Sequence, residues 1–282
     1  MTLNPYLEAV LAAVIWGSTG IFIKYLNLPP AAVSFFRLAV PTLILLIFLT
    51  VKKVKLFRGN NKLILLASTL NAARVFLYTV GFTFASIGNA VIILYTWPIF
   101  TTLLSILLLK EKVSKRTFLL LFMAFIGTTL IYLNTEFSFS DTNFLGMTAM
   151  LGSAVIYALT VIIFKKESEK YSKYEIIFYQ NVVGSIIFIP FIFANKPLPT
   201  LFQTGVGVVY GLIIGLIGFI LFFSALKKIK VSTVSFLSYL EVVSAIILSV
   251  LFFQESLTWN MLVGGLLILF ATAFIKKEKE KN

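Results

Sequence analysis

The chain consists of long apolar runs separated by short polar segments. A helix needs roughly 20 apolar residues to cross about 30 Å of hydrocarbon. Ten runs approach or reach that length, at 6–26, 30–51, 62–82, 88–109, 115–134, 143–164, 174–194, 203–224, 231–253 and 257–275. The connections between them are too short to hold a soluble domain. The pattern therefore predicts an all-α membrane protein with ten transmembrane helices.

The second half of the chain repeats part of the first. A shift of 144 positions places residues 89–116 over residues 233–260. The shift aligns Tyr95, Leu104, Ser105, Glu111 and Ser114 with Tyr239, Leu248, Ser249, Glu255 and Thr258. Because five helices are an odd number, the second half enters the membrane from the opposite side. The sequence predicts a 5+5 inverted repeat, with a first five-helix unit at 1–137 and a second at 138–282.

The composition excludes several classes of protein. The chain is 59% hydrophobic and 12% charged, with a mean hydropathy of +0.99, whereas soluble domains carry about 25% charged residues. It contains no Cys and no His, which excludes disulfides, thiolate or imidazole metal sites and the usual nucleophilic triads. It also lacks a P-loop motif. We therefore expect no metal, no cofactor and no enzymatic activity.

The basic residues predict the orientation. The net charge is +13, and 20 of the 24 Lys and Arg fall on one side of the predicted membrane. They lie in the segments 52–62, 110–116, 165–173, 227–230 and 276–281. By the positive-inside rule these segments and both termini are cytoplasmic, and the chain ends in a basic tail. The charge is thus explained by topology and does not indicate nucleic-acid binding. The N-terminus lacks the pattern of a cleaved signal peptide, so we expect the first helix to be retained.

Three ionisable residues lie deep inside predicted spans, away from the span ends: Arg37, Arg74 and Glu241. A charge at the bilayer centre costs at least about 2.5–3.5 kcal/mol on insertion scales, so each is a functional candidate. Arg74 and Glu241 lie roughly 15–18 Å from the cytoplasmic side at 1.5 Å per residue. Two interpretations are open: the two pair structurally, or they face a wet cavity, where Glu241 also exchanges a proton. Asn71 and Tyr78 share one helix face with Arg74, which favours the cavity.

Deep aromatic and amide side chains extend the candidate site, because buried Tyr and Trp need hydrogen-bond partners. The predicted substrate-binding residues are Trp16, Arg37, Asn71, Arg74, Tyr78, Tyr95, Trp97, Tyr157, Asn181, Tyr239 and Glu241, with Glu241 also the predicted coupling residue. Gly207, Gly211 and Gly215 form a row that favours close helix packing over substrate contact. Glu111 and Glu255, at opposite membrane faces, are interpreted as hinge or cap residues.

Several short motifs, taken in order, resemble the drug/metabolite transporter superfamily, specifically its EamA type. They are Trp16-Gly17, Phe36-Arg37-Leu38, Ala85-Ser86, Pro98, Glu111, Ala225-Leu226, Ser232, Tyr239-Leu240-Glu241 and Glu255. The family often has Pro after the glutamate of the ninth helix, where this chain has Val242. The resemblance covers roughly residues 6–275. It implies a cavity built from helices 1–4 and 6–9, with helices 5 and 10 as scaffold, and export or exchange of small metabolites, commonly amino acids.

These observations favour a secondary transporter that alternates access across the inner (plasma) membrane of a prokaryote. Its expected partners are a small-molecule substrate, the lipid bilayer and protons as the coupling ion, and it acts as a monomer or homodimer. The alternative is a lipid or lipid-carrier flippase, which requires a lateral opening between helices. A membrane-embedded enzyme is disfavoured because the spans hold no paired carboxylates. A channel is disfavoured because no ring of carbonyls or repeated charges lines a pore.

Overall fold

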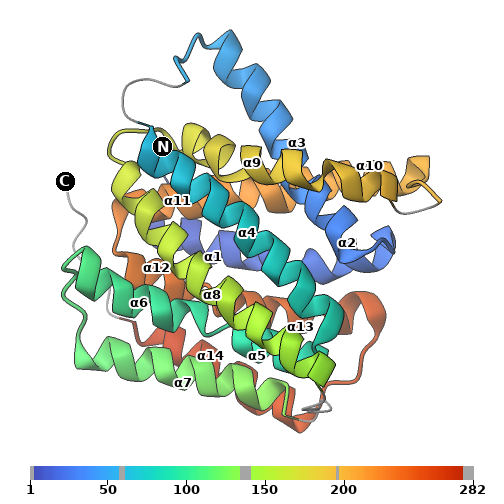
Figure 1. Cartoon of the computed structure of the whole chain (residues 1–282). Coiled ribbons are helices and arrows are strands. Elements are labelled where there is room, and N and C mark those ends of the chain that lie inside the picture. Colours follow the sequence, from blue (N-terminus) through green and yellow to red (C-terminus); the bar gives the residue numbers. More distant parts are fainter. Residues whose placement is uncertain (1–2, 57–60, 134–140, 195–196, 276–282) are drawn as a thin grey trace.

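The computed structural model describes residues 3–56, 61–133, 141–194 and 197–275, and every regular element within these ranges is a helix (Figure 1). The elements are α1 (Pro5–Gly17), α2 (Thr19–Leu26), α3 (Pro30–Val51), α4 (Lys62–Phe84), α5 (Ile87–Leu94), α6 (Trp97–Leu108), α7 (Lys115–Ile131), α8 (Asp141–Glu167), α9 (Lys173–Ala194), α10 (Leu201–Tyr210), the π-helix η1 (Gly211–Gly218), α11 (Phe219–Lys228), α12 (Val231–Leu237), α13 (Leu240–Phe253) and α14 (Trp259–Ala273). Arg58, Glu136, Lys196, the basic tail and the predicted boundary at 137/138 lie outside the described residues.

Each predicted apolar run lies on one helix or on consecutive helices, and eight of these helical stretches are long and apolar enough to cross a membrane. Four are single helices (α3, α4, α8 and α9), and four combine consecutive elements. The remaining two runs correspond to α7 and α14, which have 17 and 15 residues. The part of the chain that the structure describes is thus all-helical, with eight candidate membrane spans.

The helices run between two ends of the bundle, and hydrogen bonds between connections mark each end. At what we call the N-terminal end, Lys228 Nζ lies 2.8 Å from Glu8 Oε1, joining α11 to the start of α1. There, too, Lys230 Nζ donates to the Lys112 carbonyl and joins the α11–α12 connection to the α6–α7 connection. Lys165 Nζ of α8 donates to the Ile229 carbonyl of the α11–α12 connection. At the opposite end, Gln203 Nε2 donates to the Leu26 carbonyl at 2.8 Å.

Three of the spanning stretches are interrupted near their middle. α1 gives way to α2 at Ser18, α5 to α6 at Tyr95 and Thr96, and α12 to α13 at Ser238 and Tyr239. Pro98 stands in the first turn of α6, where a residue without an N–H starts a new helix readily. Interrupted helices leave backbone groups unsatisfied inside the bundle, which a membrane protein tolerates only where protein or water can pair them.

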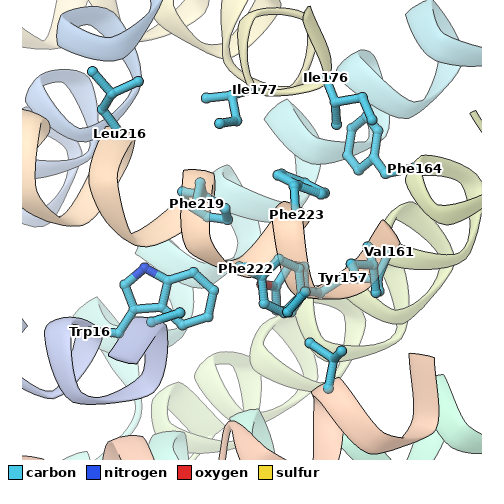
Figure 2. Packing of buried hydrophobic residues seen from close by; sticks show 14 of the residues in the cluster. Trp16, Tyr157, Val161, Phe164, Ile176, Ile177, Leu216, Phe219, Phe222 and Phe223 are labelled. Carbon is cyan, nitrogen blue, oxygen red and sulfur yellow. The ribbon is translucent and has the colours of Figure 1, made fainter. Parts of the chain in front are cut away.

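A group of aromatic rings packs where α11 meets α1 and α8. Phe219 and Phe222 lie 5.0 and 5.2 Å from Trp16, measured between ring centroids. Phe223 packs edge-to-face on Phe164 at 5.6 Å. Figure 2 shows these rings projecting from the α11 ribbon toward their neighbours. Edge and tilted ring pairs at these separations are favourable, and they hold α11 rigidly beside the cavity described below.

The predicted glycine row packs against α3, as expected. A Cβ added at Gly211 would lie 2.5 Å from the Phe36 carbonyl oxygen, and one at Gly215 would lie 2.4 Å from the Arg37 carbonyl oxygen. At Gly207 it would overlap the Phe36 ring. Only a residue without a side chain allows the two backbones to approach this closely. The row therefore presses η1 against the turn that carries Arg37.

The 144-residue correspondence extends to backbone conformation. Lys110 and Gln254, separated by 144 positions, both adopt left-handed φ angles, of 55° and 53°. The next equivalent pair caps helices: Ser114 Oγ accepts from the α7 backbone at 3.1 Å and Thr258 Oγ1 accepts from the α14 backbone at 3.3 Å. Helices α7 and α14 then pack side by side (Figure 1). The connections that precede α7 and α14 thus share the same turn and the same type of helix cap.

Candidate functional site

A cavity of about 50 Å³ lies among the interrupted helices. Its lining combines two guanidinium groups, one carboxylate, hydroxyl groups and aromatic rings. The lining residues are Trp16, Thr19, Arg37, Arg74, Tyr78, Leu94, Tyr95, Trp97, Tyr157 and Glu241. Eight of the eleven residues predicted from the sequence therefore meet in one place, although they come from six separate spanning stretches.

Arg74 is held in place by neighbours on two sides. Its Nε donates to Asn71 Oδ1 at 3.0 Å, and Asn71 Nδ2 donates to the Gln180 carbonyl of α9 at 2.7 Å. The guanidinium lies over the Tyr157 ring at 4.5 Å from its centroid, a cation–π geometry. Asn71 is buried and does not line the cavity, so it positions Arg74 instead of forming the wall.

Glu241 and the two arginines share the cavity without forming ion pairs. Among the residues that the structure describes, no carboxylate oxygen lies within 4.0 Å of a nitrogen of Arg37 or Arg74. Arg37 lies over the Phe219 ring at 5.7 Å. Glu241 lies within hydrogen-bonding reach of Tyr95. The direct Arg74–Glu241 pair, one of the two sequence interpretations, is therefore absent among the described residues, and all three charged side chains line the same cavity.

The two aligned tyrosines meet where their helices break. Tyr239 Oη donates to the Tyr95 carbonyl oxygen at 2.8 Å, and the rings stack 5.8 Å apart. This bond pairs a carbonyl that the end of α5 leaves open. Tyr239 is fully buried and does not line the cavity. Its predicted role as a wall residue is corrected: it supports Tyr95 from behind, because the packing of α12 against α6 turns its ring away.

Asn181 also lies away from the cavity. It is buried on α9 and accepts from Gln180 Nε2 at 3.5 Å, while its Nδ2 has no partner among the described residues. Two lining residues were missed, Thr19 and Leu94. Nothing in the sequence distinguishes them from many other Thr and Leu residues in apolar runs. Their position depends on where α1 and α5 break, which the sequence indicated only around Trp97-Pro98.

Another ionisable residue, outside the cavity, is buried in the bundle. Glu8 of α1 is 5% exposed. Its Oε1 accepts from Ser224 Oγ at 2.8 Å and lies 2.8 Å from Lys228 Nζ. The acid stands inside the first apolar run, so its position was visible in the sequence. Its Oε2 is buried without a hydrogen-bond partner among the described residues. Because Lys228 of α11 pairs with its charge at the N-terminal end, we interpret Glu8 as structural.

This arrangement suits the binding of a small charged solute. Arg74 and Arg37 offer donors, Glu241 accepts, and the aromatic rings provide an apolar wall. A model of the EamA-like transporter family matches the chain twice, over residues 4–133 and 144–276.

The chain belongs to the EamA-like transporter family. It is therefore a multi-pass membrane transporter, and family membership points away from an enzyme. The pseudopaline exporter of Pseudomonas aeruginosa (strain UCBPP-PA14) is 26% identical over 277 residues, covering 97% of this chain and 96% of that protein. The S-adenosylmethionine uptake transporter of Rickettsia bellii (strain RML369-C) is 25% identical, with 96% and 93% covered.

The same fold occurs in a solved structure. One crystal structure matches this EamA-like chain with a TM-score of 0.85 at 17% sequence identity, and the match covers 95% of both chains. At that identity the likeness concerns the fold alone. An uncharacterized transporter of Archaeoglobus fulgidus, 29% identical with 92% of each chain covered, extends the similarity to an archaeal sequence.

Proposed function

We propose that this protein is a secondary transporter that exports or exchanges small polar metabolites, such as amino acids, across the plasma membrane of a prokaryote. The observation that carries the proposal is the cavity, in which Arg37, Arg74 and Glu241 converge without pairing to one another. Unpaired charges in the middle of a membrane protein are retained for function. Relatives named as an exporter and an uptake transporter of small molecules support this assignment.

We further infer the architecture: ten transmembrane helices arranged as a 5+5 inverted repeat, with units at 1–137 and 138–282. Helices α7 and α14 are the fifth helix of each unit. Three observations support this architecture: the sequence similarity between residues 144 positions apart, the shared left-handed turns, and the shared helix caps. The N-terminal end carries the basic connections, which makes it the cytoplasmic end.

The N-terminal end is closed by a carboxylate cap. Glu111, after α6, accepts from Val231 N at 2.8 Å, from Ser232 N at 3.3 Å and from Ser232 Oγ at 3.1 Å. These are the first amides of α12, which have no partner within the helix. Negative charge is also favourable at a helix N-terminus. The cap ties the α6–α7 connection to α12, the helix that leads to Tyr239 and Glu241.

The equivalent cap at the opposite end is not made. Glu255 is exposed and forms no hydrogen bond or ion pair with the residues that the structure describes. The shift of 144 positions pairs Val231 with Ile87, at the start of α5. We infer that alternating access exchanges the two caps: Glu255 caps α5 when the opposite end closes, and Glu111 releases α12. Both acids would then act as gates, and neither would contact the substrate.

The test is transport in reconstituted proteoliposomes. A panel of labelled amino acids and related amines is measured with and without a pH gradient, for the native protein, for Glu241→Gln and for the control Glu169→Gln, an exposed glutamate outside the cavity. We expect the native protein and the control to respond to the gradient, and Glu241→Gln to lose that response. Unchanged transport in Glu241→Gln would remove Glu241 from the site. If no solute moves, labelled lipids test the flippase alternative.

A further inference from the structure

The charges that line the cavity do not balance. Arg37 and Arg74 contribute two positive charges, whereas Glu241 contributes one negative charge. Among the described residues no ion pair neutralises the excess. An uncompensated charge removed from water is unfavourable, and a bound group of opposite charge relieves that cost. The cavity is therefore incomplete without a negative charge supplied by its ligand.

We propose that the substrate is a small acidic zwitterion with two carboxylates and one amino group, an amino dicarboxylate. This inference rests on the proposed transport function and specifies the solute. Such a molecule carries a net charge of −1, which balances the cavity. A neutral amino acid leaves one guanidinium uncompensated, and a cationic solute increases the imbalance. The cavity of about 50 Å³ is smaller than any of these solutes and must widen to admit one. The charges of its lining residues are what select among the solutes.

Arg74 is prepared to bind the first carboxylate. Its Nε is already bonded to Asn71 Oδ1, and Tyr157 lies against the guanidinium face. The two terminal nitrogens form no hydrogen bond with a described residue. A guanidinium fixed by a second residue and a ring loses little freedom on binding, and two parallel N–H groups match the two oxygens of a carboxylate.

Arg37 provides a second, separate anion site. It stands on α3, whereas Arg74 stands on α4. It lies over the Phe219 ring and within hydrogen-bonding reach of Tyr210. A phenol is neutral, so this contact orients the guanidinium and leaves its charge for a ligand. Each of the two oriented guanidinium groups can bind one carboxylate.

Glu241 completes the pattern as the acceptor for the amino group. Its carboxylate lies within hydrogen-bonding reach of Tyr95 and meets no ammonium or guanidinium group of a described residue within 4.0 Å. Trp16 and Trp97 line the same cavity. Their rings offer a surface for the carbon chain between the charged groups and a favourable face for an ammonium.

The experiment compares solutes that differ by one group at nearly constant length. Proteoliposomes containing the full chain are assayed for uptake of glutamate, aspartate and N-(1-carboxyethyl)alanine, and for glutamine, γ-aminobutyrate, glutarate and lysine. We expect at least one amino dicarboxylate to move about tenfold faster than glutamine, because one charge-assisted contact is lost in the amide. Glutarate and γ-aminobutyrate, each lacking one charged group, are expected to be similarly weak.

Two variants separate charge from folding. Arg37→Gln is expected to lose most of the discrimination between glutamate and glutamine, and Arg37→Lys to retain it, while both elute as the native monomer or dimer in detergent. Faster movement of glutamine or lysine than of every amino dicarboxylate would overturn this inference and leave the transport function standing. If no solute in the wider panel moves, the transport function itself fails, and the inference with it.

Discussion

Arg74 illustrates how single residues acquire their role from neighbours on other helices. The sequence places it near the middle of a span, but its direction depends on Asn71 and Tyr157. Asn71 in turn is fixed by the Gln180 carbonyl of α9. At the residue scale, the Gln180 carbonyl thus fixes Asn71, Asn71 fixes Arg74, and the Arg74 guanidinium lines the cavity. Residues behind the wall matter as much as those on it.

The substitution Asn71→Ala tests this chain of contacts. It removes the acceptor for Arg74 Nε and leaves the Gln180 carbonyl without its side-chain donor. We expect the KM for the transported solute to rise about tenfold, and the unfolding free energy to fall by about 1–3 kcal/mol. Transport kinetics and thermal melting measure the two effects, with Thr69→Ala, on the exposed face of the same helix, as control. A loss of stability with an unchanged KM would make Asn71 purely structural.

At the scale of elements, the interruptions in the helices decide where the cavity lies. The breaks at Ser18, Thr96 and Ser238 all occur part-way along spanning stretches. Trp16 Nε1 donates to the Ile214 carbonyl of the π-helix at 3.2 Å, which pairs a group that the irregular helix leaves open. Breaks of this kind are common in transporters, because a broken helix presents backbone and side chains to a central site.

Close packing of η1 on α3 leads to a matched pair of variants. In Gly215→Ala the new methyl group would lie 2.4 Å from the Arg37 carbonyl oxygen, so α3 and η1 must separate and Arg37 must shift. We expect a lower melting temperature and at least tenfold weaker transport. Gly205→Ala in α10 meets nothing within 4 Å and should be neutral or slightly stabilising, by about 0.5–1 kcal/mol. Equal behaviour of the two variants would contradict the packing role.

The caps at Glu111 and Glu255 yield a prediction about conformational change. In Glu111→Ala the first amides of α12 lose their acceptor, so the N-terminal end should open more often. Because the chain has no native Cys, a single cysteine at Ser235, which is fully buried in α12, reports this opening. We expect a maleimide to label it several-fold faster in Glu111→Ala, and more slowly than in the native protein in Glu255→Ala, which loses the cap of the state that is open at this end. Faster labelling in both would show general loosening instead of a gate.

On the scale of the whole molecule, the two halves of the chain form one structure around the site. Arg37 and Arg74 come from the first half, and Tyr157 and Glu241 come from the second. The peripheral pair α7 and α14 contributes no lining residue among those described. It is instead held by the close approach of Gly127 and Gly264. Neither half could enclose the cavity alone, which fits rocking of one half against the other.

The proposed orientation can be tested by labelling from each side. Single cysteines at Lys112, in the α6–α7 connection, and at Thr200, before α10, lie at opposite ends of the bundle. An impermeant maleimide added to intact cells should label the cysteine at 200 and spare the one at 112. Inside-out vesicles should reverse the result. The same side for both would refute the inverted repeat, and the reverse pattern in cells would place the termini outside.

Much of the site was predictable from the sequence, because a membrane restricts what a chain can do. Backbone groups in lipid must pair within a helix, so long apolar runs indicate helices. A charge inside the membrane is costly and is retained mainly for function, so the sequence identified Arg37, Arg74 and Glu241 as candidate site residues. All three line the cavity. Depth also follows directly from residue position, because the rise per residue in a helix is constant.

What the sequence by itself determined is thus the helical class, the approximate limits of the helices, the family resemblance and the charges of the site. Only the tertiary structure decided which side chains face the cavity. Tyr239 supports Tyr95 from behind, Asn71 holds Arg74, and Asn181 lies elsewhere, while Thr19 and Leu94 line the wall. The physical reason is that sequence position gives depth along a helix, whereas rotation about its axis and the points of interruption depend on packing against other helices.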